Sequence, residues 1–337
     1  MKKRLISGLG AAALCALALS GCAQGSNDAA ASDNGDDALS IGFFGFAAAN
    51  SFAQATYTGI EQAAEENGAT STFVDGQFDG QLQAQQINDA VTAKTYDVII
   101  IQANDNLVVQ DPLQKAVDAG ITVVVEFVPV GPDFTSIEPQ IDGAISVVDS
   151  PVTNGETLGQ LGLEACEEVT GTCQVAYMEG DPSLPLDNAR TKAVIDTLKS
   201  GGDGIEILPN VTGGYSQDEG RTAFQDILQA HPDVNVIIGS SQAVAGATLA
   251  AEPDSGIKFI GNGSPQSGVE RVLNGEWFAL YALDVVKGGY TAAEYGIQHA
   301  QGEDVPMATD ERSLAPGEAL GTKEVLEEAG FVSGYDE

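Results

Sequence analysis

The stretch from Ile41 to Ile60 carries the first side chains that could bind a ligand. An apolar run is followed by a loop of small residues and then by Asn50-Ser51-Phe52, where a helical pattern opens. Loops at the carboxyl ends of parallel strands hold ligands in open sheets, and the first N–H groups of a helix have no partner within it. The loop lacks the glycine pattern of a phosphate cradle. This stretch is therefore the first candidate wall of a binding site.

Residue patterns typical of catalysis or metal binding do not occur. Gly261-Asn262-Gly263 is not continued at the spacing of a dinucleotide fingerprint, and there is neither a nucleophile elbow nor a helical zinc motif. The two histidines, His231 and His299, are better explained as turn or surface residues than as metal ligands or catalytic groups. We expect no enzyme activity, no cofactor and no metal site.

The charge of the chain limits its partners. The formal net charge is −35, and it becomes −38 when Lys2, Lys3 and Arg4 are removed with the leader described next. A surface this negative repels phosphate backbones and anionic lipid headgroups, which argues against nucleic acid as a partner.

The amino-terminal segment predicts export. Residues 1–21 combine a basic start with an apolar run too short to span a membrane, which is typical of a signal peptide. The run ends in Leu19-Ser20-Gly21-Cys22, which resembles the bacterial lipoprotein cleavage box, and this resemblance implies a lipid on Cys22. Residues 22–38 are small and polar without apolar periodicity, so we expect a flexible tether. The protein is thus predicted to be lipid-anchored on the outer face of the cell membrane.

Two cysteines remain in the expected mature domain. Cys166 and Cys173 flank a helix-to-strand turn at Thr170-Gly171, and export makes their oxidation possible. We favour a local disulfide, with two buried free thiols as the alternative.

Apolar runs and helical patterns alternate about every 25–30 residues, the rhythm of right-handed crossovers around a parallel sheet. A first series ends near Val125, and a second starts after residues 129–148. Its expected helices are 153–169, 188–199, 217–230 and 242–251, and its expected strands are 174–177, 205–208, 236–238 and 258–260. A strand at 277–283 and a helix at 286–301 follow, and then irregular chain at 306–321 before a short helix at 323–329. The fold class is therefore α/β, with two Rossmann-like lobes, a hinge and a central cleft.

Six short segments occur in the order of one known family. They are Asn50-Ser51-Phe52 with Gly59-Ile60-Glu61, the run 99–105 (IIIQAND), Asp187-Asn188-Ala189-Arg190, the run 230–234 (AHPDV), Gly239-Ser240-Ser241-Gln242, and Gly261-Asn262-Gly263. With the export leader, they resemble the sugar-type periplasmic binding proteins of the ribose- and galactose-binding class, which are receptors for ABC importers. The resemblance covers residues 39 to about 305. It implies three crossings between lobes, with lobe 1 at 39–149 plus 285–310 and lobe 2 at 150–284 plus 311–337.

The resemblance also implies a set of ligand-binding residues. A sugar needs planar polar groups for adjacent hydroxyls, for which Arg190 and Asn50 are the strongest candidates, and aromatic faces for its C–H surfaces. The candidate aromatic residues are Phe52, Phe127 and Tyr215, and further polar candidates are Gln102, Asn104, Glu126, Asp187, Ser240, Gln242 and Asn262.

The chain departs from the pattern of pentose and hexose receptors at several positions. Glu126-Phe127 stands where those receptors have Asp-Arg, Ser240-Ser241 replaces Asn-Asp, Asn262 replaces an Asp, and Leu283 or Asp284 replaces the hinge Gln. Fewer charged groups reduce the capacity to bind a fully hydroxylated ring, so a smaller polyol or a deoxy or modified sugar fits as well.

We predict a lipid-anchored, monomeric solute-binding protein that captures a small sugar or polyol and delivers it to an ABC permease. Three alternatives remain: a ligand-sensing partner of a chemoreceptor, a receptor for a non-sugar polar solute, and an exported enzyme, against which the lack of a catalytic motif argues. A repressor of the same fold is excluded by the leader, the missing DNA-binding head and the negative charge.

Overall fold

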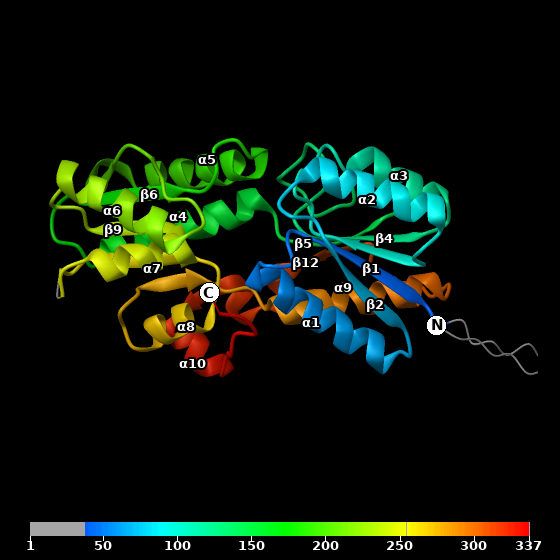
Figure 1. The fold of residues 1–337 in the computed structure, drawn as a ribbon. Helices are drawn as coiled ribbons and strands as arrows, with labels where there is room; N and C mark the ends of the chain where they lie inside the picture. Colours follow the sequence, from blue (N-terminus) through cyan, green and yellow to red (C-terminus); the bar gives the residue numbers. More distant parts are fainter. Residues whose placement is uncertain (1–37, 254, 337) are drawn as a thin grey trace, which may run out of the picture. The chain divides into compact units, whose positions relative to one another are not determined.

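The computed structural model describes residues 38–253 and 255–336, and these form two β-sheets with helices on both faces (Figure 1). The expected signal peptide at 1–21, the lipidation site Cys22 and the tether up to residue 37 lie outside the described residues. The α/β fold class predicted from the sequence is confirmed.

The first sheet has the strand order β12-β5-β4-β3-β1-β2 and is parallel throughout. Its elements are β1 (Ser40–Gly45), α1 (Ser51–Glu66), β2 (Thr70–Asp75), α2 (Gly80–Ala93), β3 (Val98–Ile101), α3 (Gln110–Asp118), β4 (Thr122–Phe127), β5 (Ile145–Val148), α9 (Val285–Ala300) and β12 (Ala308–Asp310).

Alternation along the strands divides the core of this sheet into two layers. Ile99 and Ile101 pack with α2 and α3 on one face, whereas Val98 and Ile100 pack with α1 and α9 on the other. This is the period-two geometry of a strand buried on both faces, and it explains the continuous apolar run in the sequence.

The second sheet has the order β13-β11-β10-β9-β6-β7, and β8 also pairs with β6. Its elements are α4 (Pro151–Glu167), β6 (Cys173–Glu179), α5 (Pro185–Ser200), β7 (Ile205–Ile207), β8 (Val211–Thr212), α6 (Gln217–Ala230), β9 (Val236–Ser240), α7 (Ser241–Ala250), β10 (Lys258–Asn262), α8 (Gln266–Leu273), β11 (Ala279–Tyr281), β13 (Leu320–Thr322) and α10 (Lys323–Ala329). Short 3₁₀ helices lie at Gly202–Gly204, Glu311–Leu314 and Pro316–Ala319. Helices α4 and α5 cover one face, and α6, α7, α8 and α10 cover the other.

The chain passes between the two sheets three times, after β5, after β11 and after β12. The prediction of irregular chain at 306–321 is wrong, because this segment supplies an edge strand to each sheet: β12, parallel to β5, and β13, antiparallel to β11. Each is three residues long and lacks an apolar run, so no periodicity marks it. The predicted strand at 277–283 is shorter, and β8 was not predicted.

Cys166 at the end of α4 and Cys173 at the start of β6 form a disulfide across the turn that joins these elements.

Candidate ligand-binding site

The loop that opens α1 is held in place from several sides. The Asn50 side-chain oxygen accepts a hydrogen bond from the Ala53 amide at 2.8 Å, which caps the helix. One residue of the preceding loop, Ala48, donates its amide to the Asp75 carboxylate at the end of β2. Because the oxygen of Asn50 is used by the cap, its Nδ2 group is the part of the side chain that could reach a ligand.

Three phenylalanine side chains gather at the carboxyl ends of β1 and β4. The Phe127 ring lies 4.7 Å from that of Phe52 and 6.1 Å from that of Phe46, measured between centroids. The ring of Tyr335, near the end of the chain, lies 5.8 Å from Phe52. Phe46, Phe52 and Phe127 are only half-buried, so this aromatic group retains apolar surface that could cover the C–H face of a ligand.

Phe127 has an unusual backbone conformation, with φ of 69°. The amide of Val128 donates to the carbonyl of Glu126, so Phe127 is the central residue of a tight three-residue turn, and its own carbonyl accepts from the Asp149 amide. Such a conformation is strained for a residue with a side chain, and strain of this kind concentrates at functional sites. The turn interrupts the regular alternation of side-chain directions along β4 at Phe127.

Asp187, Arg190 and Tyr215 form a polar cluster at the start of α5. The Asp187 Oδ1 atom accepts hydrogen bonds from Arg190 Nη1 and from the Tyr215 hydroxyl, both at 2.6 Å, and its Oδ2 atom accepts from the Asp181 amide. Asp187 and Arg190 are buried, and the Nε atom of Arg190 has no hydrogen-bond partner within the described chain. That atom is a donor available to a ligand.

Burial and neighbouring charges act in opposite directions on Arg190. Burial disfavours its positive charge, but Tyr215, Asp187, Tyr177 and Asp149 outweigh burial and raise the pKa of Arg190, so the guanidinium stays charged. Although the Tyr215 ring is 46% exposed, its hydroxyl is enclosed, and this burial raises the pKa of Tyr215 well above its usual range. Tyr215 therefore donates its proton to Asp187 and shows its ring to solvent.

Asp149 adds a second buried carboxyl group near Arg190. It follows β5 directly and accepts a hydrogen bond from the Tyr281 hydroxyl at 2.7 Å. Burial raises the pKa of Asp149 to about 7, against the opposing effects of the Tyr281 hydrogen bond and the Arg190 charge. At the end of β10, the Asn262 side-chain oxygen accepts from the Asn154 amide at 3.0 Å.

Several other predicted residues form hydrogen bonds within the protein. The Gln102 amide donates to Thr56, the Asn104 amide donates to the carbonyls of Phe46 and Gly76, and the Ser240 hydroxyl donates to the Gly214 carbonyl while it caps α7. Gln242 is half-buried and accepts a hydrogen bond from Ser241. Glu126 has no exposed surface. These five stay predictions as ligand contacts.

The sequence reasoning missed Phe46, Asp149, Asn154, Tyr281 and Tyr335. The rule that polar residues at strand ends form the site could have selected Asp149, because it stands directly after β5. Tyr335 lies beyond every regular element, and no local pattern marks it.

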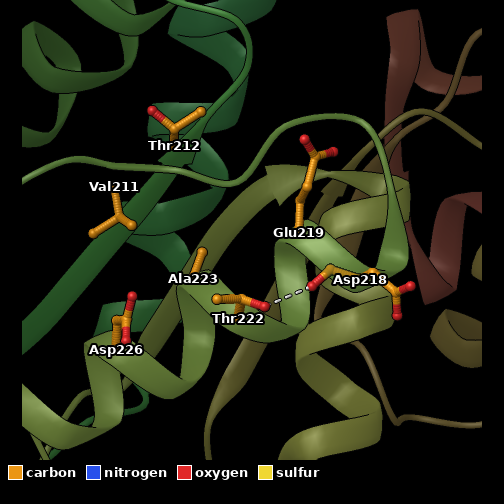
Figure 2. Close-up of a pocket in the computed structure, with 7 residues that line it drawn as sticks. All are labelled: Val211, Thr212, Asp218, Glu219, Thr222, Ala223 and Asp226. Atoms are coloured by element: carbon orange, nitrogen blue, oxygen red, sulfur yellow. Dashed lines mark hydrogen bonds between the residues drawn. The ribbon is translucent and has the colours of Figure 1, made fainter.

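Two surface hollows are lined by other residues than these. One, of about 360 Å³, is lined by Val211, Thr212, Asp218, Glu219, Thr222, Ala223 and Asp226 along β8 and α6. Figure 2 shows its carboxylates with the hydrogen bond from Thr222 to the Asp218 carbonyl. Another, of about 610 Å³, follows α2 from Asp79 to Asn88. Neither is lined by a predicted site residue, and both are open to solvent, so we do not place the site there.

Within the described residues, no group of three or more His, Cys, Asp or Glu side chains could hold a metal ion. No helix in the same part of the chain is long and apolar enough to cross a membrane.

Two sheets, one parallel and one parallel except for its edge strand β13, are joined by three crossings and carry polar and aromatic side chains at their strand ends, which defines a two-lobed α/β binding protein. Residues 41–304 match the periplasmic binding protein domain, and the chain belongs to this family. Its members are binding components of transport systems and not enzymes, which agrees with the sequence prediction.

Two curated relatives are import binding proteins. The chain is 26% identical over 200 residues to the D-apiose import binding protein of Actinobacillus succinogenes, a match that covers 58% of this chain and 59% of that protein. It is 21% identical over 218 residues to the ribose import binding protein RbsB of Bacillus subtilis, covering 63% of this chain and 67% of that protein.

Solved structures show the same fold. An ABC transporter solute-binding protein of Mycobacterium smegmatis with bound glycerol has a TM-score of 0.72 and 24% identity over 89% of this chain and 99% of its own. A solute-binding protein of Actinobacillus succinogenes with bound D-allose has a TM-score of 0.73 and 17% identity over 86% of this chain and 99% of its own.

Proposed function

We propose that this chain is the solute-binding component of an ABC importer, which binds a small sugar or polyol and delivers it to a permease. The observation that carries the proposal is the buried Asp187–Arg190 pair, whose guanidinium keeps one donor without a partner among the described residues. A buried donor without a partner costs free energy, and a ligand hydroxyl would satisfy it. The import binding proteins among its relatives support the transport role.

The aromatic group supplies the second half of the proposed site. Phe46, Phe52 and Phe127 offer apolar surface to the C–H face of a sugar, while Arg190, Asn50 and Asn262 supply hydrogen-bonding groups. Because Phe127 replaces the cation of the pentose and hexose receptors, the site favours a ligand with fewer hydroxyls or with an apolar edge. A small polyol or a deoxy sugar meets both conditions.

The proposal is tested by measuring the melting temperature against pentoses, hexoses, polyols and amino acids. A ligand that binds only the native state stabilises it by about 2.7 kcal/mol at a hundred times its Kd. We expect at least one sugar or polyol to raise the melting temperature and to show saturable binding by calorimetry. A rise with amino acids alone would contradict the proposal.

We further propose that the protein is exported and tethered to the outer face of the membrane through a lipid on Cys22, as the leader pattern indicates. We assign lobe 1 to 39–149 plus 285–310 and lobe 2 to the remainder of the folded chain, because each lobe then contains one complete sheet. We expect a monomer, which light scattering would check.

A further inference from the structure

Two fully buried glutamates lie at the first sheet and the connection that follows its strand β12. Glu126 belongs to β4, and Glu311 begins the connection that leads from β12 to β13. Neither side chain has any exposed surface. In the described chain neither carboxyl oxygen of Glu311 has a hydrogen-bond partner, whereas Glu126 has the Gln102 side chain as its polar neighbour. Buried carboxylates are costly unless they are paired or neutralised, so this arrangement needs a physical explanation.

The topology brings the two carboxyl groups together. Strand β5 lies between β4 and β12, and its Val147 pairs with Glu126 on one side and with Thr309 on the other (Figure 1). Residues in register on neighbouring parallel strands point to the same face, and Val147 packs on the face covered by α9. Glu311 follows two residues after Thr309. The connection after β12 therefore places the carboxyl group of Glu311 near that of Glu126.

Gly288 of α9 shows how closely the two groups approach. A Cβ atom at this position would lie 2.4 Å from Oε1 of Glu311 and 3.5 Å from Oε1 of Glu126. Both carboxyl groups thus converge on one point of the helix, where only a glycine leaves room for them. Gln102, which is also fully buried, lies beside Glu126, and its side-chain hydrogen bond lowers the pKa of Glu126 against the larger effect of burial.

Within the described residues, no lysine or arginine forms an ion pair with either glutamate. After burial, the neighbouring charges that raise the pKa of Glu311 most are the carboxylates of Glu126, Asp149, Asp284 and Asp310. The nearby cations are engaged elsewhere, because Arg312 binds the Asp310 carboxylate and Lys287 donates to the Leu314 carbonyl. Two adjacent carboxylates cannot both ionise in such a setting, but a protonated carboxyl group can donate to its neighbour.

We propose that Glu126 and Glu311 form a proton-holding carboxyl pair that fastens the connection between β12 and β13 to the first sheet, and that loss of the proton loosens this connection. The pair lies at one of the three crossings between the sheets, and its contribution to stability there depends on pH. Burial raises the pKa of Glu126 to about 8, and burial together with Glu126 raises the pKa of Glu311 well above its usual value.

The sign of the effect follows from proton binding. A carboxyl group with a raised pKa keeps its proton in the folded state at a pH where the unfolded chain has released it. Stability is therefore fully present below the usual glutamate value of 4.5 and is lost as pH rises towards about 8. The unfolding equilibrium constant should rise about tenfold per pH unit for each proton held.

The test compares urea unfolding of the wild-type protein, Glu311→Gln and Glu126→Gln between about pH 5.5 and about pH 8.5. Glutamine keeps the size of the side chain and removes its titration. The matched control is Glu303→Gln, which removes an exposed carboxylate and corrects for the general effect of net charge. We expect the pH dependence to weaken in either pair variant and not in the control, and Glu311→Gln to exceed the wild type in stability at the higher pH. Equal pH dependence in all four proteins overturns the proposal.

A second measurement covers the case in which the variants do not fold. Carbon-13 NMR of the wild-type protein labelled at its glutamate carboxyl groups should show two that titrate above the exposed ones. If every glutamate titrates in the usual range, the pair holds no proton and the proposal fails. If sodium or calcium ions stabilise the wild type at high pH, and do not stabilise Glu311→Gln, a cation and not a proton neutralises the pair, which also overturns the proposal.

Discussion

The guanidinium of Arg190 donates a hydrogen bond to the carboxylate of Asp187 across 2.6 Å, one helical turn apart at the start of α5. Both side chains are buried, and the same Asp187 oxygen also accepts from Tyr215. Asp187 therefore fixes the orientation of the arginine and leaves its Nε atom to other partners. The ion pair therefore also orients a donor for a ligand, because Nη1 of the guanidinium is bonded to Asp187 while Nε is not bonded to it.

Arg190→Ala should weaken binding of the identified ligand at least tenfold, or about 1.4 kcal/mol, because it removes a donor from buried ligand hydroxyls. Isothermal calorimetry measures the change. Arg221→Ala is the control, since Arg221 forms an ion pair with Asp218 at the same spacing but with both side chains exposed. Equal affinity of the two variants would place Arg190 outside the site.

Phe127 offers a test of backbone strain. With φ at 69°, a glycine fits the position without strain, whereas alanine retains a cost of about 1–2 kcal/mol. Phe127→Gly should therefore unfold at no lower urea concentration than Phe127→Ala, the reverse of the usual order. Both variants should bind ligand more weakly than Phe127→Tyr, which keeps the ring. A clearly more stable alanine variant would show that the turn relaxes in solution.

The hydrogen bond from Tyr281 to Asp149 should matter more at high pH. The pKa of Asp149 is raised from 3.8 to about 7, so its contribution to stability falls as pH rises through that interval. Above it the carboxylate is charged, and Tyr281→Phe should then cost about 1–3 kcal/mol because a buried acceptor loses its donor. Urea unfolding near pH 5 and pH 8 measures the difference.

Tyr290→Phe is the control for this effect. Tyr290 donates to Glu66 in the same way, at 2.8 Å, but both groups are exposed. Its removal should change stability little, and equally at both pH values. A Tyr281→Phe variant whose cost is equal at both pH values would mean that Asp149 does not change its protonation state between them.

The lipid anchor depends on one cysteine. Cys22→Ser should move the protein from the membrane fraction to the soluble exported fraction, because the acyl chains have no other attachment in the cleavage box. Cys15→Ser changes a leader cysteine and should leave the protein in the membrane fraction. Membrane retention of Cys22→Ser in cell fractions would disprove the anchor.

The sequence was informative where buried apolar residues recur at a regular spacing along the chain. The apolar run at Val98 to Ile101 indicated a strand buried on both faces, and the resemblance to the sugar-type binding proteins predicted Asp187 and Arg190, which the structure brings into contact. It was uninformative where contacts join distant segments without periodicity. Strands β12 and β13 are three residues each, and Glu311 meets Glu126 only because β12 lies beside β5. The positive φ of Phe127 also depends on a turn that no local preference for glycine marks.

The disulfide between Cys166 and Cys173 should stabilise the fold without affecting the site. It closes a loop of seven residue steps, for which the loss of chain entropy in the unfolded state gives roughly 2 kcal/mol. Cys173 begins β6, whereas the proposed site lies beyond the opposite end of the same strand, so the bond and the site are separated by the length of the strand.

Cys166→Ala/Cys173→Ala should therefore unfold at lower urea concentration and bind ligand with unchanged affinity. The same comparison between oxidised and reduced wild-type protein removes any effect of the substitutions themselves. Identical unfolding in both redox states would show that the bond constrains little. A loss of affinity on reduction would mean that the α4–β6 turn communicates with the site, against the separation along β6.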